Sequence, residues 1–223
     1  MVLRRQPVLA RVDVGPEAAG PPPQPEVGAY LDGLVADLEW TPRSGDHLAL
    51  ELDVGLPSFV PPLARGHDLD DYLFPIVSRL GTIRFDAVFA AKRRGIRSTI
   101  RVGPAVAADR PPPEPLVSVR TTADATSIDW KEQVHEACRA VTPAPARPGG
   151  VAVDLRFTLS RRRNWAALWQ PALDSLGPIL GVPDPTRPYR ADDSRVTALG
   201  LHRRLDDTLG HRVLVEVWWR PDR

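Results

Sequence analysis

The stretch Leu48-Ala-Leu-Glu-Leu-Asp-Val-Gly-Leu56 places an apolar residue at every second position. Successive side chains of a β-strand point to opposite faces, so this alternation predicts a strand with one buried face and one wet face. The stretch Val151-Ala-Val-Asp-Leu-Arg-Phe-Thr-Leu159 has the same alternation. The two stretches therefore predict the same kind of strand in each half of the chain.

A second pair of segments strengthens this correspondence. The segment from Asp68 to Gly81 aligns without gaps on the segment from Asn164 to Gly177, and a proline and the final glycine match at the same offset. The apolar spacing of each segment predicts a helix of about three turns.

The remaining elements follow the same order in both halves. We expect helices within residues 30–38 and 130–138, and strands at 8–14, 87–91, 98–102, 116–121, 196–201 and 213–219. The proline-rich run at 111–115 cannot continue a helix or a central strand and marks a boundary. These patterns predict an α/β (α+β) fold of two tandem β-α-β-α-β-β units, 1–110 and 111–223, packed as an internal pseudo-dimer. The alternative is a coincidental succession of α/β elements.

Composition narrows the class of protein. The chain has 223 residues, is 43% hydrophobic and 26% charged, and carries a formal net charge of +1. These values are typical of globular proteins, and no apolar run approaches the roughly 20 residues of a membrane helix. The single Cys138 excludes an internal disulfide and a zinc site made of cysteines. With no signal peptide at the N-terminus, we expect a cytoplasmic protein without a membrane partner.

Carboxylates at one predicted helix start are candidate metal ligands. Asp68 and Asp70 would project to the same side of an extended segment while Asp71 points away, and Asp86 lies near the entry to the next strand. Oxygen ligands of this kind suit Mg²⁺, which can activate water and stabilise phosphodiester charge. The alternative is helix capping, because Asp70 or Asp71 is an expected N-cap and acids favour a first helical turn.

The segment His67-Asp-Leu-Asp-Asp-Tyr-Leu-Phe-Pro-Ile-Val resembles the core motif of RusA-type Holliday-junction resolvases, Asp-x-Asp-Asn followed by a lysine. The second half is similar at Ala172-Leu-Asp-Ser-Leu-Gly and at Asp192-Asp193-Ser-Arg-Val196. The resemblance covers roughly the last sixty residues of each unit. It implies homodimer-like packing and Mg²⁺-dependent nicking of branched DNA. Asp68, Asp70 and Asp86 would then be catalytic metal ligands, with Asp192 and Asp193 as a vestigial or auxiliary second set.

The sequence departs from that motif at several positions. Asp71 stands where the family has Asn, and Phe74 stands where it has its catalytic lysine. In the second unit, the positions matching Asp68, Asp70 and Asp71 are occupied by Asn164, Ala166 and Ala167. The chain therefore offers at most one working site.

Two basic clusters are candidate phosphate contacts, with solvated hairpin tips as the alternative. They consist of Lys92, Arg93, Arg94 and Arg97 in the first unit and of Arg161, Arg162 and Arg163 in the second. Trp165 and Trp169 could stack on bases, although such a pair more often fills a core.

The leading hypothesis is a RusA-like protein that binds branched or double-stranded DNA and acts as a Mg²⁺-dependent endonuclease. A competing hypothesis is a non-catalytic binding or assembly module on the same fold, whose acids serve as caps and turn formers. A third is an unrelated α/β domain. The sequence leaves open a further homo-oligomer.

Overall fold

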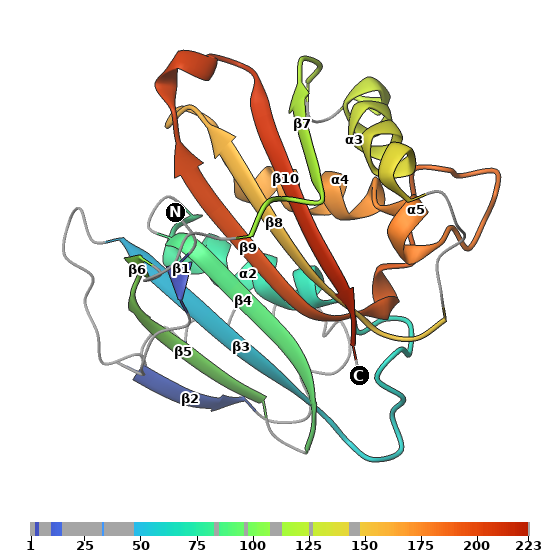
Figure 1. Ribbon diagram of the computed structural model, residues 1–223. Helices are drawn as coiled ribbons and strands as arrows, with labels where there is room; N and C mark the ends of the chain where they lie inside the picture. Colours follow the sequence, from blue (N-terminus) through green and yellow to red (C-terminus); the bar gives the residue numbers. More distant parts are fainter. Residues whose placement is uncertain are drawn as a thin grey trace.

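A computed structural model shows a mixed α/β fold built on one eight-stranded mixed sheet with the strand order β2-β5-β3-β4-β9-β8-β10-β7 (Figure 1). It describes residues 3–4, 10–14, 33, 47–82, 85–95, 98–107, 113–124, 127–142 and 148–222. The strands of the large sheet are β2 Ala10–Val14, β3 Leu48–Leu56, β4 Phe85–Arg94, β5 Ser98–Pro104, β7 Val117–Thr121, β8 Val151–Leu159, β9 Val196–Leu205 and β10 Val213–Pro221. A separate two-stranded sheet pairs β1 Leu3–Arg4 with β6 Val106–Ala107.

The described helices cover one face of the large sheet (Figure 1). They are α2 Leu69–Leu80, α3 Ile128–Val141, α4 Trp169–Asp174 and α5 Gly177–Leu180, with a short 3-10 turn, η3 Ala166–Leu168, before α4. A second such turn, η4 Asp193–Arg195, precedes β9, and a third, η5 Asp207–Leu209, follows it. The predicted helix within 30–38 lies outside the described residues, except for Gly33. None of the described helices has the length and apolar character needed to cross a membrane.

The two halves of the large sheet have the same strand order, read from its outer edges inward. In the first half β2 pairs with β5, β5 with β3 and β3 with β4; in the second, β7 pairs with β10, β10 with β8 and β8 with β9. Only the innermost pair of each half, β3–β4 and β8–β9, is parallel, and both shift register after the first residue, at Leu48/Ala49 and Val151/Ala152. The two halves therefore repeat one another down to the position of an irregularity.

The halves join through the antiparallel pair β4–β9, which is centred on Phe89 opposite Gly200. On one side of this centre Ala87 pairs with His202, and on the other Ala91 pairs with Ala198. Aligning β4 on β9 makes Ala87 equivalent to Ala198 and Ala91 equivalent to His202, so the register is self-complementary. Such pairing is the arrangement of a twofold contact between identical subunits.

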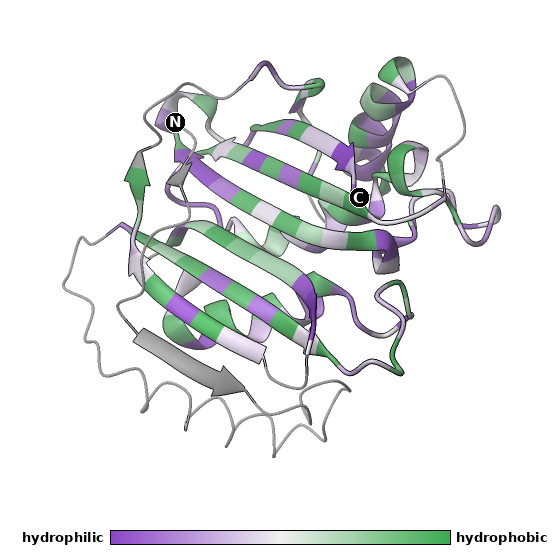
Figure 2. Ribbon diagram, turned by 60° about the horizontal axis from the view of Figure 1, so that its bottom comes forward, coloured by the Kyte–Doolittle hydropathy of each residue, from purple (hydrophilic) through white to green (hydrophobic). Residues whose placement is uncertain are grey.

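A single core spans both halves. Alternate strand residues such as Leu50, Val88, Leu199 and Val153 belong to one buried cluster with apolar residues of the helices. The hydropathy colouring of Figure 2 shows the matching alternation of polar and apolar residues along the strands. The units expected at 1–110 and 111–223 thus share one sheet and one core.

The three-turn helix predicted from Asn164 to Gly177 is not continuous in the structure. The segment that aligns on α2 is divided into η3 and α4, and α5 follows as a separate short helix. Pro178 stands in the first turn of α5 and has no N–H to bond Asp174 O, which accepts from Ala191 N–H instead, so α4 does not continue into α5. In α2 the only proline is Pro75, and the helix runs through it for 12 residues.

Candidate functional site

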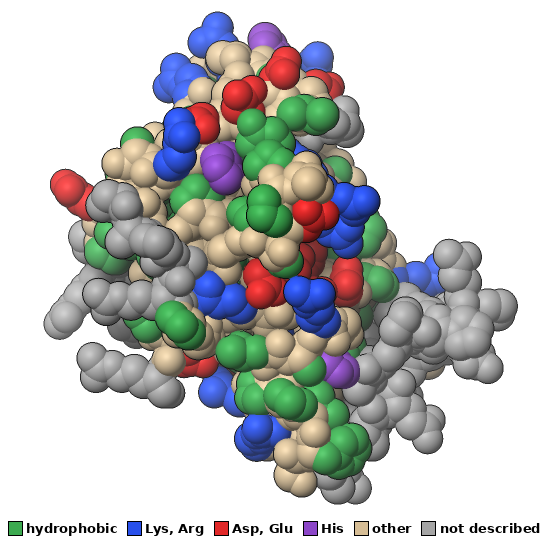
Figure 3. Space-filling model, turned by 90° about the vertical axis from the view of Figure 1, so that its right-hand side faces the viewer, with side chains coloured by type: hydrophobic (Ala, Val, Ile, Leu, Met, Phe, Trp, Pro, Cys, Tyr) green, Lys and Arg blue, Asp and Glu red, His purple; other side chains and the backbone are tan. Residues whose placement is uncertain are grey.

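Side chains from both halves meet where α2 begins, β4 ends and β9 is about to begin. The helix runs antiparallel to β4, so its N-terminus lies beside the end of that strand, and the antiparallel pairing brings the start of β9 to the same place. This region lies at the right of Figure 1, and acidic side chains gather near the middle of the face that Figure 3 presents. We define the acidic site as Asp68, Asp70, Asp71, Lys92, Asp192 and Asp193.

The carboxylates of the acidic site range from buried Asp70 to exposed Asp71, and they lie close enough to repel one another. Asp70 is only 6% exposed, and burial together with the charges of Asp71 and Asp193 raises its pKa to about 7. Burial and the neighbouring charges of Asp68 and Asp174 raise the pKa of Asp193 to about 6. Both shifts favour the protonated form; burial is the larger cause in each case, and the neighbouring carboxylates add to it.

Lys92 supplies a positive charge within this site. It is 9% exposed, and its ammonium group donates a hydrogen bond to the backbone oxygen of Ser194 at 2.7 Å. Burial lowers the pKa of Lys92, while Asp68 and Asp193 act in the opposite direction. Lys92 thus interacts with four of the five aspartates, namely Asp68, Asp70, Asp192 and Asp193, and its contact with Ser194 ties the first half to the second.

Asp68 occupies the N-cap position of α2 without acting as a cap. Its side chain accepts no capping hydrogen bond from the helix, and its Oδ1 is buried with no hydrogen-bond partner. Burial raises the pKa of Asp68, and Lys92 opposes that effect. Asp70 and Asp71 lie in the first helical turn, so the N-cap expected at one of them falls at Asp68 instead. A buried carboxylate oxygen without a partner is costly unless something else pairs with it.

The chemistry of the donor set fits a hard cation. Carboxylate oxygens are the ligands that Mg²⁺ prefers, and Ser194 Oγ holds Asp192 in place by donating to its Oδ1 at 2.6 Å. Among the described residues, no three acidic, histidine or cysteine side chains stand in a ready-made ligand arrangement. Binding a cation would therefore require the aspartates to turn toward a common point.

Asp86 is not part of the acidic site, which corrects the expected set of Asp68, Asp70 and Asp86. Its carboxylate accepts hydrogen bonds from Arg203 at 2.7 and 3.2 Å and pairs with the ring of His47. Asp86 lies six residues before Lys92 on β4, or about 20 Å along the strand. The physical reason is that α2 and β4 run in opposite directions, so the start of the strand meets the end of the helix. Asp192 and Asp193 occupy the place expected for Asp86.

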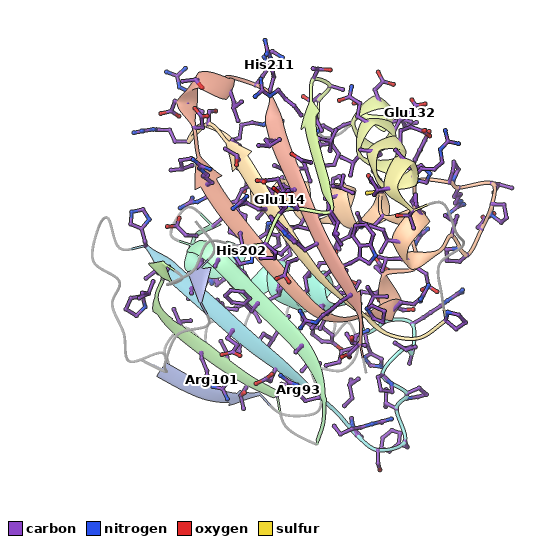
Figure 4. The ribbon with its side chains drawn as sticks, in the orientation of Figure 1. Arg93, Arg101, Glu114, Glu132, His202 and His211 are labelled. Atoms are coloured by element: carbon purple, nitrogen blue, oxygen red, sulfur yellow. The ribbon has the colours of Figure 1, made fainter. Side chains whose placement is uncertain are left out.

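The basic residues around β4 do not form one cluster. Lys92 and Arg93 are neighbours on a strand and point to opposite faces, and Arg93 pairs with Asp53 at 3.1 Å on the face without helices. Figure 4 shows Arg93 near Arg101, which also contacts Asp53. Arg97 lies outside the described residues.

The second basic cluster lies at a hairpin end of the second half. Arg161 pairs with Asp207 at 2.7 Å, and Arg163 donates to the backbone oxygen of His211, which Figure 4 shows at the tip of the molecule. Arg162 lines an open depression of about 880 Å³ there. The three arginines lie at or near the surface, with Arg161 and Arg163 engaged in these contacts, in a different region from the acidic site.

The tryptophan pair of the second half is part of the core. Trp165 and Trp169 are each 1% exposed and pack edge to face, with their ring centroids 4.9 Å apart. Trp165 Nε1 donates to the backbone oxygen of Thr82 at 2.9 Å, a contact between the halves. Burial excludes both rings from stacking on a base.

Sequence reasoning missed the place of Lys92 and the joining of Asp192 and Asp193 to the first-half acids. One signal was the segment Asp192-Asp193-Ser-Arg-Val196, which leads into the strand predicted at 196–201. No family model matches this chain, and it has no significant match among curated proteins or solved structures.

Proposed function

We propose that the chain is a fused duplication of one RusA-like unit. The shared strand order, the two register shifts and the self-complementary β4–β9 pairing support this origin. The turns after β3 and β8 agree as well, with Val60 N–H bonded to Pro57 O and Arg163 N–H bonded to Ser160 O. A coincidental succession of α/β elements would not be expected to share these register shifts and turn bonds.

On this basis we propose a Mg²⁺-dependent endonuclease that acts on branched DNA with one working site. The observation that carries the proposal is the convergence of five aspartates and Lys92 at the junction of the halves. Asp68, Asp70 and Asp193 would hold the cation, with Asp71 and Asp192 beside them. Bound Mg²⁺ would supply activation of water and stabilisation of the charge on the phosphate.

The chain's own residues have distinct tasks in this proposal. Asp68 offers an oxygen that has no other partner, and Ser194 keeps Asp192 oriented. Lys92 is held by Ser194 and would share its ammonium group with a phosphate oxygen. Phe74 stands where the RusA-type motif has its catalytic lysine. Arg161, Arg162 and Arg163 would contact backbone phosphates away from the cleavage point.

A non-catalytic DNA-binding or assembly module is the competing function. It is favoured by the ion pair between Arg203 and Asp86. Arg203 aligns with Lys92, so a cation at this strand position can serve only to neutralise a carboxylate. In that case Lys92 would only balance part of the aspartate charge.

The test is cleavage of a labelled four-way junction, a flap and a linear duplex by the full chain, with Mg²⁺ or with EDTA. We expect Mg²⁺-dependent nicking of the branched DNAs by the wild type and a loss of at least about 100-fold in Asp70→Asn. Asp129→Asn is the matched control, because Asp129 is also an acid in a first helical turn, that of α3. Cleavage that persists in Asp70→Asn would refute the site. Binding of branched DNA without any cleavage would favour the non-catalytic module.

A further inference from the structure

The two equivalent turns that follow β3 and β8 present different side chains. The two turns have the same backbone hydrogen bonds. Besides the bond within each turn described above, Gly95 N–H donates to Leu56 O in the first half, and Asp206 N–H donates to Leu159 O in the second. Aligning the turns places Phe59 opposite Arg162. One turn therefore carries an aromatic ring where its counterpart carries a cation.

Phe59 is the most exposed large hydrophobic residue in the described part of the chain, at 83%. Leu63 is exposed too, and Pro61 between them lies at the surface, whereas Val60 packs against the core. We call Phe59, Pro61 and Leu63 the apolar ridge. Figure 2 shows hydrophobic colouring on this loop between β3 and α2.

The loop that carries the ridge is held firmly. Arg94 Nη1 donates to the backbone oxygens of Pro57, Ser58 and Val60 at 3.4, 3.3 and 2.6 Å. At the other end of the loop, the His67 ring is bonded to the Tyr72 hydroxyl of α2 at 2.9 Å. Prolines restrict the backbone further. These contacts hold the backbone of the loop, and the ring of Phe59 lies in solvent, where an apolar side chain is unfavourable.

The surroundings indicate the chemistry of a partner. The loop leads directly into Asp68 of the acidic site, while Arg65 is exposed on it and Arg94 lies beneath the turn. A partner that suits this combination has flat apolar faces and negative charges. Nucleobases and their phosphates have both, and stacking of a base on an aromatic ring does not depend on sequence.

We propose that Phe59 stacks on an unpaired base next to the phosphate that is cut. This inference rests on the proposed function and deepens it, because it names the substrate class: DNA whose bases are already unpaired at a branch or flap. A continuous duplex offers no free base face to the ring unless it is unstacked first. Arg162, at the equivalent turn, meets only phosphate in this arrangement.

The experiment measures binding by the full chain with Ca²⁺ in place of Mg²⁺, so that DNA remains intact. The probes are a flap carrying 2-aminopurine at its unpaired branch base and a linear duplex with the same label. We expect the wild type to quench the flap probe and to prefer the flap. Phe59→Ala should lose the quenching and about tenfold of the preference, and Phe59→Trp should keep both. Ile128→Ala is the control, because Ile128 is a 68% exposed residue at the start of α3.

The outcomes separate the inference from the function on which it rests. If Phe59→Ala quenches and prefers the flap as the wild type does, the stacking role is wrong, although Mg²⁺-dependent cleavage by the wild type can still stand. If the wild type binds neither DNA, both fail together. If Phe59→Ala changes only self-association, measured by analytical ultracentrifugation, the ridge is a protein contact and the inference is overturned.

Discussion

The acidic site and the corresponding region of the other half of the sheet differ in how their charges are paired. We define the paired region as Asn164, Ala166, Ala167, Arg203 and Asp86, which lie at the start of η3, the end of β9 and the start of β4. Arg203 is equivalent to Lys92, and in place of the helix-start aspartates there are an amide and two methyl groups. Its guanidinium pairs with Asp86 and lies 6.0 Å from the centre of the Trp165 ring.

This difference provides an internal control for the proposed site. The paired region keeps the same backbone arrangement with one cation and one carboxylate, so the fold does not require a cluster of acids at a helix start. The acidic site instead keeps five carboxylates around one lysine, with an unpartnered oxygen on Asp68 and raised pKa values for Asp70 and Asp193. Uncompensated buried charge costs stability. A cation bound at the acidic site, as proposed above, would offset this cost.

The largest predicted effect comes from removing the cation of each region. Arg203→Met leaves Asp86, whose side chain is 11% exposed, without its main partner and should lower the free energy of unfolding by about 3–5 kcal/mol. Lys92→Met should also destabilise, but adding Mg²⁺ should recover part of that loss, since a cation can replace the ammonium charge. Urea unfolding with and without Mg²⁺ measures both.

The double variant Arg203→Met/Asp86→Asn serves as the control for Arg203→Met. Because it removes both charges, its free energy of unfolding should fall by less than that of Arg203→Met alone. Equal Mg²⁺ responses of Arg203→Met and Lys92→Met would contradict the distinction between the two regions.

The next effect is the pH dependence of stability that the acidic site imposes. The pKa values of Asp70 and Asp193 are raised from the ordinary 3.8 to about 7 and about 6, so the folded state keeps protons that the unfolded state releases. Stability from these groups is therefore full below pH 4 and is lost as the pH rises toward 7. The loss should amount to at most a few kcal/mol, and thermal unfolding between pH 5 and pH 8 measures it.

Asp70→Asn isolates this contribution, because the variant differs from the wild type only at that carboxyl group. The variant should lose less stability than the wild type between pH 5 and pH 8, and it should be the more stable of the two at pH 8. A wild-type slope that Asp70→Asn leaves unchanged would mean that Asp70 is not buried among like charges.

The sequence predicted most of the secondary structure because alternation and helical spacing are local signals. The strands β3 and β8, the helix α2 and the helix α3 lie where the patterns placed them. The break between α4 and α5 follows from Pro178, a local signal that the alignment on α2 concealed.

The site was predicted only in part because it depends on how distant elements pair. Asp68 and Asp70 are two residues apart in sequence and stay together, whereas choosing between Asp86 and Asp193 requires the direction of α2 relative to β4 and β9. The same pairing turns Lys92 inward and leaves Arg93 on the opposite face. Neither fact has a local pattern to reveal it.

The smallest predicted effect compares two helix starts and decides what Asp68 contributes to the fold. The N-cap of α3 is Ser127, whose hydroxyl accepts from Trp130 N–H at 3.2 Å, so Ser127→Ala should cost about 1 kcal/mol of unfolding free energy. Asp68→Ala removes no capping bond and relieves repulsion with Asp71 and Asp192, so it should be neutral or stabilising at pH 8. Urea unfolding of both variants measures the difference. If Asp68→Ala costs as much as Ser127→Ala, its carboxylate serves the helix, and the acidic site loses the free oxygen on which a cation would depend.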